Sequence, residues 1–193
     1  MEIIVIRHGE TEENAKHILM GHRQGILSKK GREQAGRLAL KLKNRKIDAI
    51  FSSDLRRARD TTSAIAKYHK VPVFYTKELR EQNYGVFQGR PLKELLDAQH
   101  SSRERGPAYR PKGGESLADV KRRVKSFMDG LGNDYEDKTI LISAHAGIAW
   151  SLFSIYGNVP LDRLIRMKQK NAGVLIIRTK NGKSKILKDA MFE

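Results

Sequence analysis

The residues Ile3-Ile4-Val5-Ile6 form an unbroken β-branched run at the start of the chain. A strand with one exposed face alternates apolar and polar side chains, whereas a strand covered on both faces is apolar at every position. Full coverage of this kind is typical of parallel sheets, whose helical crossovers pack above and below the strands. The run therefore predicts a three-layer α/β/α fold with a mostly parallel sheet.

Strand and helix patterns alternate along the rest of the chain. Ser28 is suited to cap a helix over residues 29–45, in which apolar residues recur at helical spacing. The other elements expected are strands at 49–51, 73–75 and 139–143, and helices after Asp54, at 117–131 and at 147–156. Asn181-Gly182, between apolar runs, is a strong hairpin signal, so the sheet is expected to end in an antiparallel pair. No repeat or linker divides the chain, and we expect one domain over residues 1–193.

The segment from about Leu79 to Gly114 departs from this alternation. It mixes Gly, Pro and Arg with one short apolar helix near residues 92–96. We interpret residues 81–115 as a small lid inserted over the edge of the sheet. Residues 90–112 are rich in Arg, Pro and Ser, and we expect this part to be mobile and open.

The charge balance narrows the choice of partner. The 193 residues include 38 Lys and Arg against 22 Asp and Glu, a formal net charge of +16 at pH 7. Such a charge favours an anionic partner, either a phosphorylated small molecule or a nucleic acid. The basic residues are scattered in small groups and are not interleaved with the aromatic residues of a stacking platform. Nucleic-acid binding is therefore the weaker interpretation.

The chain has no cysteine, which excludes a disulfide framework, a thiolate metal site and a Cys nucleophile. This composition suits a reducing compartment. No apolar run approaches the roughly 18 residues of a membrane helix, and the first residues lead straight into a strand without the pattern of a signal peptide. We therefore expect a cytoplasmic protein without a membrane partner. Nothing in the sequence indicates an oligomeric state.

Two histidines follow predicted strands, at the edge where open α/β sheets form their sites. His8 follows the first strand and His145 the fourth, each with a glycine within two positions that lets the backbone approach a ligand. The second strand ends near Ser53, with Arg57 just inside the next helix. This set suits a phosphoryl group, because Arg forks neutralise its oxygens while one neutral imidazole attacks phosphorus and another donates a hydrogen bond.

The sequence Arg7-His8-Gly9-Glu10-Thr11 resembles the signature of the histidine phosphatase superfamily. The branch in question contains phosphoglycerate mutases, fructose-2,6-bisphosphatases and broad-specificity phosphatases. The similarity continues through Asn14, Gly21, Ser52-Ser53-Asp54-Leu55, Arg57-Ala58, Glu81, Gly85, Gly89, Gly113-Gly114-Glu115-Ser116 and Ala144-His145-Ala146-Gly147. It covers nearly the whole chain.

The resemblance implies that five of these residues are catalytic, of which four act on the phosphoryl group. His8 would be the nucleophile that becomes phosphohistidine, and Arg7, Arg57 and His145 would hold the phosphoryl oxygens. Basic groups around one phosphoryl group stabilise a dianion without a metal ion. No metal and no cofactor are therefore expected.

The resemblance also implies residues for substrate binding and proton transfer. Asn14 and Gly21 would contribute to substrate binding, and Glu81 would donate the proton that the leaving alkoxide needs. The chain departs from the family pattern at Phe87-Gln88, where the aromatic residue is usually followed by Glu, and at Gln24, where Asp is frequent. These changes affect the polarity of the pocket more than the reaction.

The activity implied is hydrolysis of a phosphomonoester of a small metabolite. The alternative is a phosphoglycerate mutase dependent on 2,3-bisphosphoglycerate, with which Tyr84-Gly85 is compatible. The short stretch from Gly89 to Gly113 leaves little room for the longer insertion of family mutases. A basic nucleic-acid-binding module is the distant alternative.

Several of these residues also have simpler interpretations. Glu81 could pair with Arg80 or Arg90 at the surface, and only the resemblance selects Arg57 from the neighbouring arginines. The basic stretch 121–125 is expected to be a solvated helix face. The remaining histidines are expected to be ordinary surface or loop residues: His17, His22, His69 and His100. The resemblance also implies that His17 and His22 flank the mouth of the substrate pocket, where either could touch the substrate.

Overall fold

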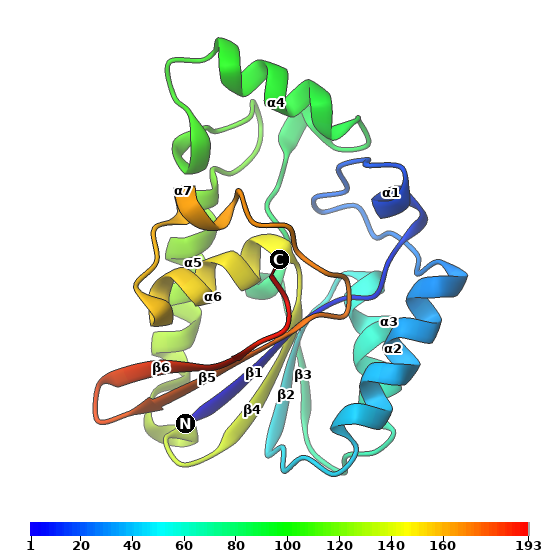
Figure 1. Cartoon of the computed structure of the whole chain (residues 1–193), viewed down its shortest axis with the longest axis vertical. Helices are drawn as coiled ribbons and strands as arrows, with labels where there is room; N and C mark the ends of the chain where they lie inside the picture. The colour runs from blue at the N-terminus through cyan, green and yellow to red at the C-terminus, as the bar shows by residue number, and fades with distance from the viewer. Residues whose placement is uncertain (193) are drawn as a thin grey trace.

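The fold is a mixed sheet between two layers of helices (Figure 1). The computed structural model describes residues 1–192. Its strands are β1 (Glu2–Arg7), β2 (Ala49–Ser53), β3 (Val73–Thr76), β4 (Thr139–Ala144), β5 (Val174–Lys180) and β6 (Lys183–Asp189). They lie in the order β3-β2-β4-β1-β5-β6. The strands β1 to β4 are parallel to one another, and β5 runs antiparallel to both of its neighbours, β1 and β6.

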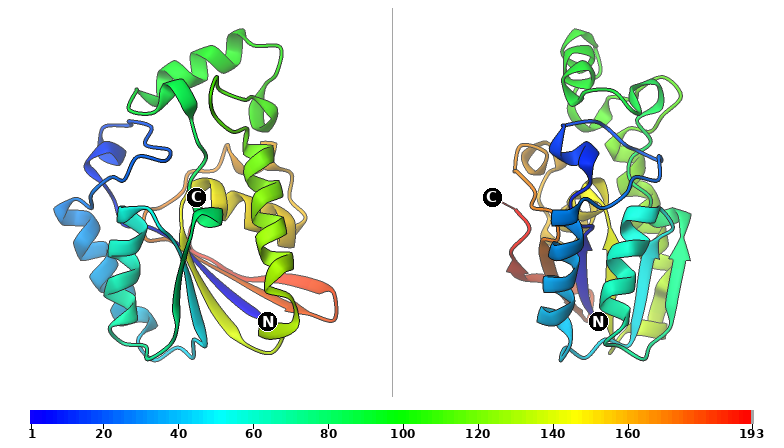
Figure 2. Two further views of the ribbon diagram at one scale, coloured as in Figure 1. Left: turned by 180° about the vertical axis from the view of Figure 1, so that it is seen from behind. Right: turned by 90° about the vertical axis from the view of Figure 1, so that its right-hand side faces the viewer.

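The helices α2 and α3 cover one face of the sheet, and α5 and α6 cover the other (Figure 2). The helices are α1 (Glu12–Ala15), α2 (Lys29–Leu42), α3 (Arg56–Ala66), α4 (Leu92–Ser101), α5 (Leu117–Leu131), α6 (Ala146–Gly157) and α7 (Leu161–Leu164). Within residues 1–192, none of them has both the length and the apolar character needed to cross a membrane.

The strand β1 shows why the sequence requires two covering layers. Ile3 and Val5 pack into the hydrophobic cluster that contains the apolar residues of α5 and α6. Ile4 and Ile6 point the other way, into the cluster with the apolar residues of α2 and α3. All four side chains are fully buried. The three-layer fold predicted from this run is confirmed.

The predicted elements are present, with small differences in length. The helix expected over 29–45 ends at Leu42, because residues 43–46 offer no apolar side chain to bury before Ile47 enters the core. The hairpin turns at Asn181-Gly182, both with positive φ, as its sequence requires. The short helices α1 and α7 were not predicted, and each has only four residues.

The insertion predicted at 81–115 lies between β3 and α5 and contains α4 (Figure 1). It stands over the edge of the sheet that the carboxyl ends of the strands form (Figure 1). Its main chain is joined to the segment after α1: Leu19 N donates to Arg90 O at 2.9 Å, and Leu92 N donates to His17 O at 2.9 Å. These two segments together bound the space above the strand ends.

Candidate active site

The carboxyl ends of three neighbouring strands bring the predicted histidines together. Because β4 lies between β1 and β2, residues that follow these strands meet at one edge of the sheet. His8 follows β1 and His145 follows β4, and their rings meet edge to face with centroids 5.1 Å apart. Both side chains are buried. Ser53, at the end of β2, lies beside them, with its Oγ 2.8 Å from His145 Nε2.

The hydrogen bonds of His8 determine its tautomer. Its Nδ1 lies 2.7 Å from Gly9 O, and a carbonyl only accepts, so Nδ1 carries the proton and donates. The other nitrogen, Nε2, accepts a hydrogen bond from Arg57 Nε at 3.2 Å. Burial, followed by the charges of Arg57 and Arg7, holds the pKa of His8 well below its usual range. His8 is therefore a neutral imidazole with a lone pair on Nε2.

Arg57 is fixed by the main chain around it. Its NH1 donates to Arg23 O at 2.6 Å and to Gln24 O at 3.2 Å, and its NH2 donates to Gly21 O at 2.9 Å. The side chain is only 1% exposed, and burial lowers its pKa to about 10. Arg57 therefore remains cationic at neutral pH, with its Nε directed at His8. The neighbouring Arg56 and Arg59 are exposed, as expected for residues outside the site.

Two buried nitrogen atoms beside His8 have no hydrogen-bond partner in the part of the chain described. They are Arg7 Nε and His145 Nδ1. An unpartnered buried polar atom is costly, and a bound ligand or water can supply the missing partner. Burial is the main reason why the pKa of His145 lies well below its usual range. A guanidinium and an imidazole nitrogen beside His8 fit the oxygens of a phosphoryl group.

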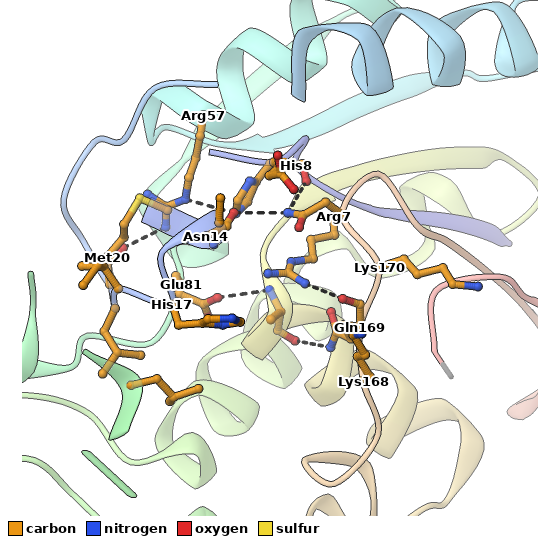
Figure 3. A pocket seen from close by; sticks show the side chains of 18 of the residues that line it. Arg7, His8, Asn14, His17, Met20, Arg57, Glu81, Lys168, Gln169 and Lys170 are labelled. Carbon is orange, nitrogen blue, oxygen red and sulfur yellow. Dashed lines mark hydrogen bonds between the residues drawn. The ribbon is translucent and has the colours of Figure 1, made fainter. Parts of the chain in front are cut away.

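A cavity of about 800 Å³ opens above these residues (Figure 3). It is lined from one side by the segment after α1, from another by the insertion, and from a third by the loop before β5. His145 is not among the lining residues, but its ring centroid lies 5.1 Å from that of His8, which is. The other residues predicted from the sequence all line this cavity: Arg7, His8, Asn14, Gly21, Arg57 and Glu81.

The carboxyl group of Glu81 sits at the N-terminus of α6. One oxygen accepts from Gly147 N at 2.9 Å and the other from Ala146 N at 3.1 Å. A Cβ on Gly147 would lie 2.5 Å from Glu81 Oε1. The glycine after His145 therefore admits the Glu81 carboxyl, and the glycine after His8 packs against the main chain of Gly31. This tight packing against protein atoms is a second reason, beside the predicted approach to a ligand, for a glycine at both positions.

The simpler interpretation of Glu81 as a surface ion pair was wrong. Arg80 binds Asp54 through Nε at 2.7 Å and NH2 at 2.6 Å. Arg90 pairs with Glu94 on α4. The Glu81 side chain is only 7% exposed and points toward α6. Its carboxyl therefore belongs to the cavity and not to the outer surface.

Metal ligands are not grouped in the part of the chain that the structure describes. Within residues 1–192, no three His, Cys, Asp or Glu side chains are arranged to hold a metal ion. The positive charge at the cavity floor comes from Arg7 and Arg57.

A family model described as the histidine phosphatase superfamily (branch 1) matches residues 3–190. The chain belongs to the histidine phosphatase superfamily. This confirms the family predicted from the sequence, and with it, at the level of the family, the prediction of an enzyme.

Relatives of this histidine phosphatase chain are named as phosphatases or as mutase-like. The bovine fructose-2,6-bisphosphatase TIGAR is 42% identical over 136 residues, which cover 67% of this chain and 50% of that protein. The chain thus spans about half the length of that relative. Phosphoglycerate mutase-like protein 4 of Arabidopsis thaliana is 36% identical over 79% of this chain and 69% of its own length. Phosphoserine phosphatase 1 of Hydrogenobacter thermophilus is 28% identical over 97% of this chain and 91% of its own.

Solved structures of the superfamily share the whole fold. A mycobacterial glucosyl-3-phosphoglycerate phosphatase, solved with VO3, has a TM-score of 0.87 at 26% identity. The match covers 98% of both chains. The similarity confirms the three-layer fold with its antiparallel β5-β6 pair.

The loop before β5 supplies site residues that sequence reasoning missed in this histidine phosphatase. Gln169 O accepts a hydrogen bond from Arg7 NH1 at 2.8 Å. Asn171 Nδ2 donates to His8 O at 3.3 Å and to Asn14 Oδ1 at 3.2 Å. Because the Asn14 oxygen is occupied, its amide NH₂ is free to serve as a donor toward the cavity. The sequence did contain one signal for these site residues, because the polar segment Gln169–Asn171 directly precedes an apolar strand.

The neutral state of His8 and His145 makes the stability of the fold depend on pH. Both pKa values are lowered by burial, so below about pH 6.5, the ordinary pKa of histidine, the unfolded chain binds more protons than the folded one. The free energy of unfolding should therefore fall as the pH drops through this range. The slope is up to about 1.4 kcal/mol per pH unit for each histidine.

Urea unfolding between about pH 5 and about pH 6.5 measures this slope. The variant His145→Gln should have a shallower slope than the unsubstituted chain. The variant His100→Gln, which changes an exposed histidine on α4, should keep the original slope. An unaltered slope in His145→Gln would contradict a buried neutral imidazole.

Proposed function

We propose that the chain is a phosphomonoester hydrolase that works through a phosphohistidine on His8. The observation that carries the proposal is the state of His8, a neutral imidazole whose Nε2 lone pair lies beside Arg57 at the floor of the cavity. A neutral imidazole is a good nucleophile, and the chain has no cysteine to compete with it. The family to which the chain belongs supports a phosphohistidine mechanism.

The proposed reaction has two displacement steps. In the first, His8 Nε2 bonds to phosphorus, the bond between phosphorus and the ester oxygen breaks, and that oxygen takes a proton from the Glu81 carboxyl group. In the second, water bonds to phosphorus while the P–N bond breaks, and the water gives a proton to the Glu81 carboxylate. The products are an alcohol and inorganic phosphate, and His8 and Glu81 return to their starting states.

The proposed site stabilises charge with protein groups alone. Arg7, Arg57 and His145 would donate to the phosphoryl oxygens, supported by the amide of Asn14 and by Gly21, whose carbonyl holds Arg57 in place. Preorganised donors of this kind stabilise the charge that develops in the transition state. The proposal therefore includes no metal and no cofactor.

The proposed substrate is a small phosphorylated metabolite. The cavity of about 800 Å³ is large enough for an alcohol with several carbon atoms beside the phosphoryl group. Relatives named as acting on fructose 2,6-bisphosphate, phosphoserine and glucosyl-3-phosphoglycerate support this class.

The proposal also covers location and partners. We propose one domain over residues 1–193 that acts in the cytoplasm, without a nucleic-acid or membrane partner.

A mutase dependent on 2,3-bisphosphoglycerate is the second candidate. Tyr84 lines the cavity, and burial raises the pKa of its hydroxyl, which stays protonated and could bind a second polar group of the substrate. The mutase-like relative from Arabidopsis thaliana favours the same activity. The brief insertion favours hydrolysis, because a mutase must exclude water from the phosphoenzyme.

Phosphorus NMR of 3-phosphoglycerate and of a 4-nitrophenyl phosphate control, both in the presence of a chelator, tests the proposed function. We expect inorganic phosphate to be released from both esters. Conversion to 2-phosphoglycerate that depends on 2,3-bisphosphoglycerate, with little free phosphate, would favour the mutase. Absence of any turnover together with salt-sensitive nucleic-acid binding would reject both enzymatic candidates.

A further inference from the structure

The side chain of Arg123, on α5, binds the main chain that leads into Glu81. Arg123 NH1 donates to Glu78 O at 2.6 Å and to Arg80 O at 3.1 Å. These carbonyls belong to the residues that lead into Glu81. The Arg123 side chain is only 16% exposed, whereas that of the preceding Arg122 is 77% exposed. The expectation that residues 121–125 form a solvated basic face was therefore wrong for Arg123.

The same guanidinium binds Glu115, which holds the other side of the loop. Arg123 Nε and NH2 each donate to one Glu115 carboxylate oxygen at 3.1 Å. Glu115 Oε2 also accepts from Asn83 N at 2.9 Å, and Glu115 N donates to Asn83 O at 2.8 Å. The Arg123–Glu115 pair therefore contacts the chain on both sides of Glu81, and the fork geometry fixes one orientation.

Two more contacts leave the Glu81 main chain little freedom. Gln82 Nε2 donates to Glu115 O at 2.7 Å, and His22 Nε2 donates to the carbonyl of Glu81 at 2.9 Å. The Glu81 carboxyl is bound to the N-terminus of α6, and the residue lines the cavity. Its position thus depends on a loop that Arg123 and Glu115 hold.

We propose that Arg123 and Glu115 are positioning residues for proton transfer by Glu81. The inference rests on the proposed function, in which Glu81 protonates the leaving group. Proton transfer needs the donor within hydrogen-bond reach of the ester oxygen, and a misplacement of about 1 Å by a change away from the reacting atoms can cost about 10²-fold in rate. Neither residue lines the cavity, so both act through the loop.

The test compares two esters on variants of Arg123 and Glu115 and on a control variant of Arg122. Arg123→Ala is expected to lower kcat for an alkyl phosphate by about 10²-fold and to change kcat for 4-nitrophenyl phosphate much less, because nitrophenolate leaves without a proton. Glu115→Gln should show the same selectivity. Arg122→Ala removes an exposed side chain and one of several contacts of Asp119, and it should leave both values unchanged. Arg123→Lys keeps the charge but loses the two-pronged guanidinium contact with Glu115. It takes the place of Arg123→Ala in the test if Arg123→Ala does not fold.

A double-variant cycle with Glu81→Gln separates this role from general damage to the fold. If Arg123 acts through Glu81, adding Arg123→Ala to Glu81→Gln lowers kcat for the alkyl phosphate no further. Additive losses, or equal losses on both esters, would overturn the positioning role while leaving the hydrolase intact. If Glu81→Gln itself lowered kcat equally for the alkyl phosphate and for 4-nitrophenyl phosphate, Glu81 would not be the proton donor of the proposed function. Unfolding midpoints in urea confirm that each variant is folded in the assay.

Discussion

Replacing His8 with alanine is expected to lower the turnover of every phosphomonoester by on the order of 10⁵-fold. The imidazole supplies the atom that bonds to phosphorus, and no other nucleophile of the described chain has a lone pair in the same place. Arg57 Nε would lose its acceptor, while the main-chain bonds of its NH1 and NH2 groups remain. Substrate binding should therefore be weakened less than turnover.

Steady-state release of inorganic phosphate from 4-nitrophenyl phosphate measures this effect. His100→Ala is the matched control, because it removes an exposed imidazole from α4. We expect the control to keep full activity. A His8→Ala variant that retained a tenth of the activity would show that His8 is not the nucleophile.

Glu81→Gln is expected to reduce kcat for alkyl phosphates by about 10²- to 10⁴-fold, the range typical of a lost general acid. The amide cannot donate a proton to an alkoxide. It also has one acceptor oxygen where the carboxylate offers two, so one of the N–H groups of Ala146 and Gly147 loses its partner. For 4-nitrophenyl phosphate the loss should be much smaller.

Initial rates on the two kinds of ester, measured with the same enzyme preparation, provide the comparison. Glu78→Gln makes the same chemical change on an exposed side chain three residues earlier, and it should leave both rates unaltered. Equal losses on both esters in Glu81→Gln would assign Glu81 to positioning and not to proton donation.

The features that could be predicted from the sequence are those that depend on local pattern. The β-branched run at Ile3–Ile6 specifies a strand covered on both faces, and in the structure all four side chains are buried in two opposite clusters. Residues that follow parallel strands must meet at one edge of the sheet, which explains why His8 and His145 could be placed together. Arg57 needed the family resemblance, because its neighbours carry the same charge.

The contacts that could not be predicted join distant parts of the chain. Arg7 and Gln169 are 162 residues apart and meet only because β5 pairs antiparallel with β1. Arg123 has the spacing of a solvated residue on α5, and its main-chain partners come from a loop more than 40 residues earlier. Gly147 has the local sequence of a ligand-binding turn, yet it is the Glu81 carboxyl that approaches it. Helical or strand periodicity contains no information about which loop will cover a given face.

The phosphorylated enzyme itself tests the central proposal most directly. Mixing the enzyme with ³²P-labelled substrate and quenching in alkali should trap the label on the protein as a phosphoramidate, which is stable in base and labile in acid. Peptide mapping should place the label on His8, and the His8→Ala variant should trap none. Label on a serine or an aspartate, or an acid-stable adduct, would contradict a phosphohistidine mechanism.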